Sequence, residues 1–404
     1  MSSHEAPGDG TSTSEFKRVL KGRDVLAIGF GAMIGFGWIV LTGHFLESAG
    51  PGGAALAFVI GGVIVGFVAF TYAELVAAMP NVGGEYQYVL RAIGSRSAFL
   101  CAWALTLGYI TVVAFEAVAL PQTLLYLFPD MLAGKLWTVA GYDVYASWVA
   151  VGVVGAILMT YLNFRGVRPA AVFQSLAVLF LLVVGALLIT GSFVGGSVST
   201  MEPLFVGGAT GIIGVLVATP FLYVGFDVIP QSAEEINLPF RKIGILLLVS
   251  LLMAIVWYVT IMLTVGSAAP VSVLNGSELA AAEGMTALWN SSAMGTVLVV
   301  GGIFGILTSW NGFLIGASRL IYAMGASGML PRWFGVLHPR YRTPGNALLF
   351  IGILSVMAPF FGRKTLVWLV DAGGFSLVIA YIMVSLSYVM LRRNEPDMER
   401  PFRT

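Results

Sequence analysis

The sequence is poor in charged residues, histidine and cysteine. Only 10% of the 404 residues are charged, against about 25% in a soluble domain, and the formal net charge of +1 argues against a nucleic acid partner. A single cysteine, Cys101, excludes an intrachain disulfide and a four-cysteine metal site. The sequence has only three histidines, and no serine, histidine and aspartate are expected at the same depth in the membrane, so few residues could serve as catalytic groups. We therefore expect neither an enzyme nor a bound cofactor.

Apolar sequence, by contrast, is abundant, with 58% hydrophobic residues and a mean hydropathy of +0.91. A helix needs about 20 apolar residues to cross a bilayer. Ten stretches meet this requirement, near 24–46, 54–79, 98–128, 146–164, 169–193, 208–232, 243–267, 293–324, 345–362 and 365–391. Residues 1–20 are polar, which predicts a disordered cytoplasmic tail rather than a cleavable signal peptide. The sequence predicts an all-α integral membrane protein.

Basic residues predict the orientation of these spans. With the N-terminus inside and the spans alternating, all of the 21 Lys and Arg residues except Lys135, Arg363 and Lys364 fall on the cytoplasmic side. Such an excess is the positive-inside pattern of multi-pass proteins. We expect a protein of the plasma (inner) membrane with a cytoplasmic N-terminus.

Ten spans divide into two repeats of five, residues 21–193 and 208–391, followed by a charged cytoplasmic linker at 392–404. An odd number of spans per half forces the halves into opposite senses, as in inverted-repeat transporters. The linker is not a typical end of a chain: either further helices follow it, or the protein never had them. The first span is interrupted by glycines at 29–37 and the sixth at 220–227. Matching interruptions indicate a binding site, because broken helix persists in hydrocarbon only beside a cavity.

The backbone at these interruptions suits a zwitterion. A half-helix beginning near Gly35 carries about +0.5 charge and free N–H groups, which bind a carboxylate. Carbonyls before it accept from an ammonium group, and the sixth span offers a second set. The predicted substrate-binding backbone comprises Ala32, Met33, Ile34, Gly35, Phe36, Gly37, Phe221, Leu222 and Val224. Glycines also serve helix packing, but two matched clusters favour an amino acid site.

Several motifs together resemble one family, the amino acid–polyamine–organocation permeases. They are Gly35-Phe36-Gly37, Tyr72-Ala73-Glu74, Gly83-Gly84-Glu85-Tyr86, Gly225-Phe226-Asp227 and Ser318-Arg319 with Tyr322. The resemblance runs from about Gly22 to Thr404 and implies a LeuT-type fold, a 5+5 inverted-repeat bundle of ten helices with the first and sixth discontinuous. It also implies secondary transport of an amino acid or small amine.

The resemblance further implies roles for individual side chains. A gating aromatic is expected at Phe221, with a packing aromatic as the alternative, and Phe313 is expected to face the same cavity. Relatives often carry a small or hydroxyl residue where this chain has Phe36, whose ring either narrows the pocket or faces lipid. We therefore expect a large polar amino acid to be a poor substrate.

Glu116 stands alone well inside the third span. Insertion of a charged side chain at the centre of a membrane helix costs a free energy of about 2.5–3.5 kcal/mol. Tyr109, Val113 and Glu116 share one helix face, which the resemblance turns toward the cavity. Glu116 then binds a substrate cation or carries a proton; a hydrogen-bonded structural role is the alternative. Asp227 is either a proton carrier or a helix cap.

The driving force is left open by the sequence. No ATP-binding motif is present, and the fifth span lacks the lysine that some proton-linked relatives carry there. Thr308 and Ser309 resemble the hydroxyl pair of a sodium site, although such hydroxyls commonly bond their own helix. Three modes therefore remain open: proton coupling through Glu116 or Asp227, sodium coupling, and exchange of substrates. A substrate-gated channel or sensor on the same fold is the rival function.

Overall fold

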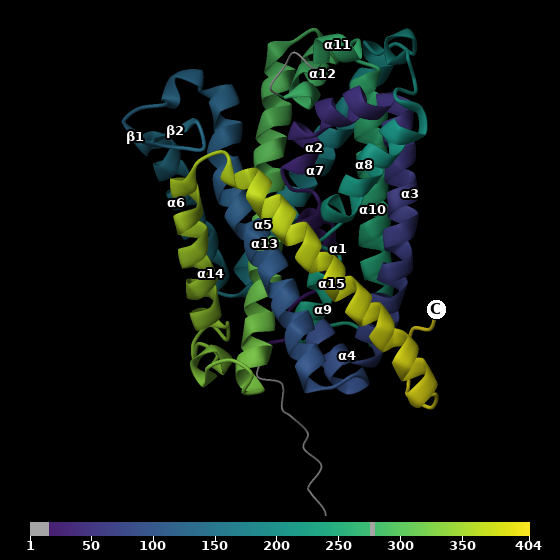
Figure 1. Cartoon of the computed structure of the whole chain (residues 1–404), viewed down its shortest axis with the longest axis vertical. Coiled ribbons are helices and arrows are strands. Elements are labelled where there is room, and N and C mark those ends of the chain that lie inside the picture. Colours follow the sequence, from purple (N-terminus) through teal and green to yellow (C-terminus); the bar gives the residue numbers. More distant parts are fainter. Residues whose placement is uncertain (1–15, 275–278) are drawn as a thin grey trace, which may run out of the picture.

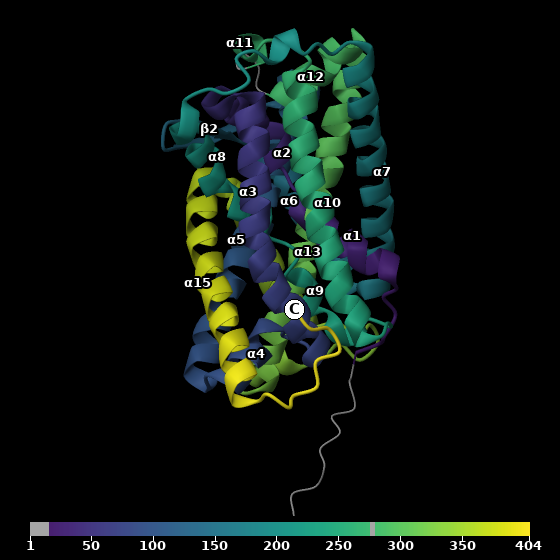
Figure 2. The same cartoon turned by 90° about the vertical axis from the view of Figure 1, so that its right-hand side faces the viewer.

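The computed structural model describes residues 16–274 and 279–404, which form a bundle of helices (Figures 1 and 2). Seven helices in this part of the chain are long and apolar enough to cross a membrane. They are α3 (Thr42–Ala78), α5 (Ser95–Leu127), α6 (Ala146–Phe164), α7 (Val167–Val194), α10 (Phe240–Gly266), α13 (Ser292–Ala326) and α15 (Thr365–Asn394, with Ala372–Asn394 as its apolar part). The all-α membrane class is confirmed.

The other three expected spans are shorter or interrupted. The first consists of α1 (Gly22–Met33), α2 (Gly37–Val40) and the beginning of α3. The sixth consists of α8 (Gly208–Leu222) and α9 (Val228–Gln231). The ninth is α14 (Gly345–Met357), which η5 (Ala358–Phe361) extends.

A sharp kink divides α3 at Gly50, where the first expected span gives way to the second. Gly50 has φ 73° and ψ 166°, a conformation that favours glycine, and Pro51 follows it. A side chain there would also collide with the loop after α7, because its Cβ would lie 2.6 Å from the Leu204 carbonyl oxygen. The kink therefore turns the chain between two membrane segments within a continuous element.

Short elements cover the two ends of the bundle. The hairpin of β1 (Lys135–Val139) and β2 (Tyr142–Tyr145) lies at the same end as α11 (Val271–Leu274) and α12 (Ala280–Trp289), while α4 (Glu85–Ala92) lies at the opposite end (Figure 1). The single-turn helices are η1 (Pro129–Met131), η2 (Ser199–Met201), η3 (Ala233–Glu235) and η4 (Arg332–Gly335). We call the end that carries α4 the α4 end.

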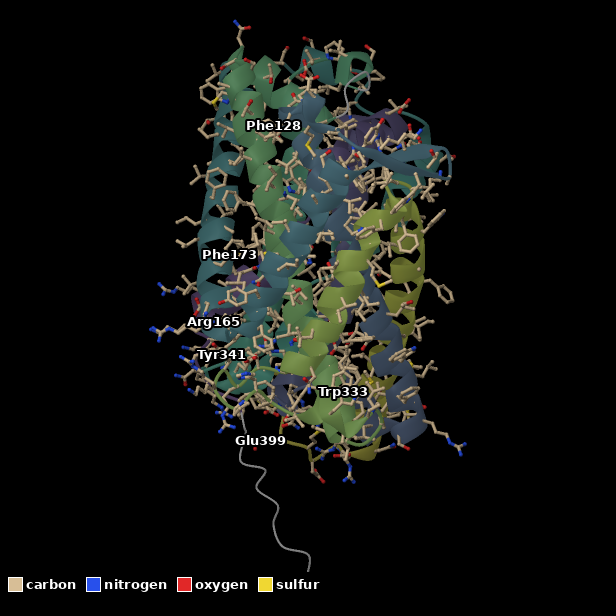
Figure 3. All side chains as sticks on the ribbon, turned by 90° about the vertical axis from the view of Figure 1, so that its left-hand side faces the viewer. Phe128, Arg165, Phe173, Trp333, Tyr341 and Glu399 are labelled. Carbon is tan, nitrogen blue, oxygen red and sulfur yellow. The ribbon has the colours of Figure 1, made fainter. Side chains whose placement is uncertain are left out.

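The outer surface matches a bilayer. Large apolar side chains point outward from the long helices, including Phe67, Phe193 and Phe375, which are 71%, 85% and 73% exposed. Nitrogen-tipped side chains gather around Arg165 and Tyr341, toward the end of the bundle opposite to Phe128 (Figure 3). An apolar belt with basic groups below it is the surface expected of a membrane-spanning bundle.

Buried ion pairs join the helices near the α4 end. Glu235 accepts from the Arg319 guanidinium, with Arg319 Nε 2.9 Å from Glu235 Oε2 and both side chains almost fully buried. Glu74 at the end of α3 pairs with Arg392 at 2.5 Å and with Arg400 at 3.1 Å. These carboxylates are therefore structural ion-pair partners.

Candidate functional site

The two interruptions of the backbone lie against each other. Helix α1 ends at Met33 and α2 begins at Gly37, while α8 ends at Leu222 and α9 begins at Val228. A Cβ atom on Gly225 would lie 2.8 Å from the backbone of Ala32 and Met33. Gly225 also has φ 131°, so both its conformation and the close approach require glycine. Two glycine-rich segments nearly two hundred residues apart in sequence thus form one site.

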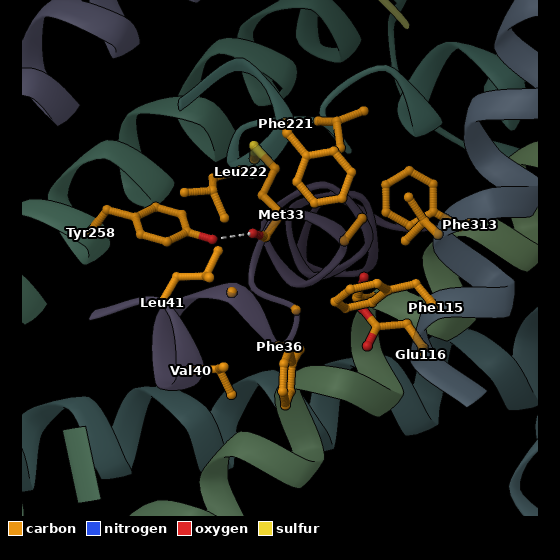
Figure 4. Close-up of a pocket in the computed structure, with 16 residues that line it drawn as sticks. Met33, Phe36, Val40, Leu41, Phe115, Glu116, Phe221, Leu222, Tyr258 and Phe313 are labelled. Atoms are coloured by element: carbon orange, nitrogen blue, oxygen red, sulfur yellow. Dashed lines mark hydrogen bonds between the residues drawn. The ribbon is translucent and has the colours of Figure 1, made fainter. Parts of the chain in front are cut away.

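A cavity of about 310 Å³ opens at this junction (Figure 4). Residues expected at the site that line it are Ala32, Met33, Gly35, Phe36, Gly37, Glu116, Phe221, Leu222, Val224, Ser309 and Phe313. Lining residues that sequence reasoning missed are Val40, Leu41, Val112, Phe115 and Tyr258. The walls are almost entirely apolar, with Glu116, Ser309 and Tyr258 as the polar side chains.

Five expected binding or coupling residues lie outside the cavity lining: Ile34, Tyr109, Val113, Thr308 and Asp227. Ile34 is fully buried, and its carbonyl oxygen faces Gly305 of α13. Tyr109 packs behind Phe313, with ring centroids 5.2 Å apart. Val113 is buried, and its carbonyl accepts from Ser355 of α14. Thr308 donates to Gly305 of its own helix at 2.9 Å, the self-bonding that hydroxyls in membrane helices commonly show.

Glu116 lies directly against the first interruption. A Cβ atom on Gly35 would be 2.7 Å from Glu116 Oε1 and 3.0 Å from Ser309 Oγ. The other carboxyl oxygen, Oε2, is buried and has no hydrogen-bond partner in the described chain. An unpartnered buried polar atom is costly, so this carboxyl group is available to a ligand that reaches the cavity.

The backbone at the first interruption also leaves polar groups open. No residue of the described ranges accepts a hydrogen bond from the N–H groups of Gly35, Phe36 or Gly37. The Met33 carbonyl, expected to receive an ammonium group, already accepts from the Tyr258 hydroxyl at 3.0 Å (Figure 4). These N–H groups are therefore available to bind an anion. The Met33 carbonyl oxygen already accepts one hydrogen bond and has one lone pair left for a ligand.

Aromatic side chains form one wall of the cavity. Phe36 packs edge to face on Phe115, with centroids 5.6 Å apart, and Phe115 packs in the same way on Phe221 at 6.5 Å. Phe36 is buried, so its ring narrows the pocket and does not face lipid. With Phe313, four phenylalanines line the cavity, which favours an apolar group over a polar one.

Asp227 stabilises the second interruption from outside the cavity. One carboxyl oxygen accepts from the Gly225 N–H at 2.8 Å, and the other accepts from the Tyr381 hydroxyl at 3.4 Å. Asp227 precedes α9 but makes no side-chain capping bond to it. Its hydrogen bond holds the unwound backbone, which differs from the ordinary helix cap that the sequence suggested.

A neutral network occupies the space between α1, α7 and α13, beside Thr308. The Gln174 amide nitrogen donates to the carbonyls of Ala27 and Thr308, each at 3.1 Å. Asn311 donates to the Gln174 amide oxygen at 2.7 Å and accepts from Asn163 at 2.8 Å. Two carbonyls that face each other from α1 and α13 are thereby satisfied by an amide donor.

Packed segments close the α4 end beneath the cavity. The N–H groups of Val19 and Leu20 both donate to the Glu235 carbonyl, and Leu20 forms a parallel bridge with Ile236. Phe16 packs edge to face on Tyr322 of α13. The segment before α1 is thus bound across the region that follows the second interruption.

A helical membrane bundle with a cavity at two interrupted helices has the form of a small-molecule transporter. The chain belongs to the amino acid permease family, since the family described as "Amino acid permease" matches residues 20–404. The resemblance to permeases inferred from the motifs is confirmed.

Three curated relatives are similar along nearly the whole chain. The methylthioribose transporter of Bacillus subtilis is 28% identical over 97% of this chain and 85% of its own length. The branched-chain amino acid permease BcaP of Bacillus subtilis is 28% identical over 96% and 83%. The lysine-specific permease LysP of Escherichia coli is 26% identical over 96% and 80%.

Proposed function

We propose that this chain is a secondary transporter that carries a small amino acid with an apolar side chain by alternating access. The observation that carries the proposal is the cavity at the junction of the two interruptions, which combines open N–H groups, one carboxyl group and aromatic walls. Membership of the amino acid permease family supports it. The names of two relatives, the branched-chain amino acid permease BcaP and the methylthioribose transporter, point to substrates with aliphatic or thioether groups.

Each part of a zwitterion has a proposed partner in the cavity. The substrate carboxylate binds the N–H groups of Gly35, Phe36 and Gly37, at the positive end of the second half-helix. The ammonium group binds Glu116 Oε2, which supplies a charge-assisted hydrogen bond. The side chain lies on Phe221 and Phe313. This arrangement uses the three N–H groups that the first interruption leaves open.

The finer architecture belongs to the same proposal. We assign repeats at 21–193 and 208–391 that form a LeuT-like 5+5 inverted bundle, with the tail at 1–20 and the linker at 392–404 on the cytoplasmic side of the plasma membrane. The matched interruptions of the first and sixth spans support the repeats. The distribution of Lys and Arg residues supports the orientation.

The geometry disfavours sodium as the coupling ion at the hydroxyl pair. Thr308 and Ser309 face different surroundings, since Thr308 bonds Gly305 while Ser309 lies beside Glu116 and Gly35. The Ala27 and Thr308 carbonyls are engaged by the Gln174 amide nitrogen. A sodium ion needs several oxygen ligands that are not already bound to a donor.

Substitution of Gly35 tests the site. Purified protein in proteoliposomes is expected to take up L-leucine, and Gly35→Leu is expected to reduce uptake to background, because its side chain would fill the space between Glu116 and Ser309. Gly66→Leu is the matched control, since a side chain at Gly66 would have no protein atom within 4 Å. Wild-type uptake by Gly35→Leu would contradict the assigned pocket.

Competition identifies the substrate class. Unlabelled L-isoleucine, L-methionine and methylthioribose are each added to the L-leucine uptake assay, and L-lysine is added as the polar competitor. The apolar walls predict that the apolar amino acids compete and that lysine does not. Strong competition by lysine alone would overturn the assignment of an apolar side chain.

A further inference from the structure

Besides Glu116 and Asp227, another buried carboxyl group without an ion-pair partner in the described chain lies near the α4 end, outside the cavity lining. Glu85 is the first residue of α4 and has no exposed surface. The Gln231 side-chain amide of α9 donates to Glu85 Oε2. The remaining oxygens of this pair, Glu85 Oε1 and Gln231 Oε1, are both buried and have no partner among the described residues.

The groups around Glu85 are acidic or neutral. Those that interact electrostatically with Glu85 are Tyr72 from α3, Tyr88 from α4, Cys101 and Tyr109 from α5, Asp227 from the second interruption and Tyr381 from α15. No ion pair to Glu85 or Asp227 is found in residues 16–274 and 279–404. The buried Glu74 and Glu235, by contrast, each have an arginine.

Two neighbouring buried carboxyl groups without a cation do not both remain ionised. Asp227 accepts hydrogen bonds from the Gly225 N–H and the Tyr381 hydroxyl, which stabilise its charged form. From the side chains of the described residues, Glu85 accepts a single hydrogen bond, donated by Gln231. Burial raises the pKa of Glu85, and the charge of Asp227 raises that pKa further. The proton therefore resides on Glu85.

We propose that Glu85, paired with Gln231, is the proton-binding site that couples transport in this protein; the proposal rests on the transport function proposed above. A protonated carboxyl group and a primary amide can form two hydrogen bonds face to face. A proton on Glu85 Oε1 donates to Gln231 Oε1, while the observed bond from the Gln231 amide to Oε2 remains. One proton thus satisfies both oxygens that otherwise lack a partner.

The position of the pair links proton binding to the closed α4 end. A Cβ atom on Gly84 would lie 2.8 Å from Pro230 Cβ, so the start of α4 packs directly on α9. Loss of the proton leaves the Glu85 carboxylate facing both the Gln231 oxygen and Asp227, which weakens this contact. In this step the O–H bond of Glu85 breaks, its electron pair stays on the carboxylate, and solvent water at the α4 end accepts the proton as that end opens.

A pH gradient across proteoliposomes tests the coupling. Wild-type protein is expected to take up L-leucine faster when the outside is acidic, with or without sodium. Glu85→Gln keeps the amide pairing but carries no proton, so it should retain leucine–leucine exchange at equal pH and lose at least four fifths of the response to the gradient. Glu399→Gln, an exposed residue at the same end (Figure 3), is the matched control and should behave as wild type.

The outcomes separate this inference from the proposed function. A wild-type gradient response that persists unchanged in Glu85→Gln, or uptake driven by sodium and not by pH, overturns Glu85 as the coupling site while leaving the transporter intact. No binding, exchange or uptake of any tested amino acid by wild type overturns the transport function itself.

Infrared spectra of the protein provide a readout that does not depend on transport. In a Glu116→Gln background, we expect a protonated-carboxyl C=O band at neutral pH that disappears at alkaline pH and is missing after Glu85→Gln. Because the folded pKa of Glu85 is raised, its contribution to stability is complete below the ordinary carboxyl pKa and is lost as pH rises through the raised value. Absence of a titrating band would contradict a protonated Glu85.

Discussion

The buried carboxyl groups differ in their partners. Those paired with arginine have a structural role, whereas those without a cation are candidates for a functional role. Glu74 and Glu235 each bind arginine, which accounts for their burial. Glu116 faces a cavity, and within residues 16–274 and 279–404 it has no arginine partner and one oxygen without a hydrogen bond. Sequence alone identified Glu116 by its depth in an apolar span, but Glu85 was missed because it lies in a short polar-looking segment whose burial depends on α9 and α15.

Removal of the Glu116 charge is expected to weaken substrate binding. Glu116→Gln keeps the shape of the side chain but loses a charge-assisted hydrogen bond to the substrate ammonium, worth about 1.5–3 kcal/mol. The Kd for L-leucine should therefore rise roughly 10- to 150-fold, as measured by scintillation proximity or calorimetry on purified protein. Glu47→Gln, which changes an exposed carboxyl, should bind as wild type. An unchanged Kd in Glu116→Gln would remove Glu116 from the site.

At the scale of elements, glycine patterns predicted the interruptions well and the helix faces poorly. Both interruptions occur within the predicted segments. At Gly225 a positive φ and a close backbone contact both favour glycine, and at Gly35 and Gly37 neighbouring side chains leave no room for a Cβ atom. The cavity face of α5 consists of Val112, Phe115 and Glu116, not of Tyr109, Val113 and Glu116. The face that a helix turns toward the cavity depends on how the helix packs against elements distant in sequence. The periodicity of one apolar span does not show this packing.

Residues contributed by distant elements were the hardest to foresee. Tyr258 reaches the Met33 carbonyl from α10, yet nothing around it in the sequence marks it as a site residue. The local pattern of α10 is simply apolar, so a tyrosine there is as consistent with packing as with a cavity wall. Such contacts depend on tertiary arrangement.

The buried ion pair between α13 and η3 supports a prediction about stability. Arg319→Gln leaves Glu235 charged and unpaired, and breaking such a pair by removing one partner costs about 3–5 kcal/mol. The apparent melting temperature in detergent should fall clearly for Arg319→Gln, and it should largely recover in Arg319→Gln/Glu235→Gln. Arg332→Gln, an exposed arginine near the same end, serves as control. A single variant as stable as wild type would show that the pair contributes nothing.

For the whole molecule, the α4 end is closed by segments from opposite ends of the sequence. Residues before α1 bond to Glu235 and Ile236, and the C-terminal stretch returns to Glu74, whose carboxylate accepts from the Thr404 N–H at 2.9 Å. Transport by alternating access requires that these contacts open. The sequence indicated a charged linker at 392–404, but not its return to α3.

A reversible cross-link tests this requirement. Leu20 and Ile236 are bridge partners, and backbones paired in this way lie about 4.8 Å apart, within the range of a disulfide. Oxidation of Leu20→Cys/Ile236→Cys should stop L-leucine uptake, and a reductant should restore it. The single variant Leu20→Cys should transport under both conditions. Full uptake by the oxidised double variant would show that this end need not separate.

At Gly225 the main chain of the second interruption rests on the main chain of the first. Close-packed atoms cannot be compressed, so a tilt of residues 32–33 toward this point must displace residue 225 as well. A solute that displaces either segment therefore displaces the other as well. For the two repeats proposed above, we expect this contact to make the movement of one repeat accompany that of the other.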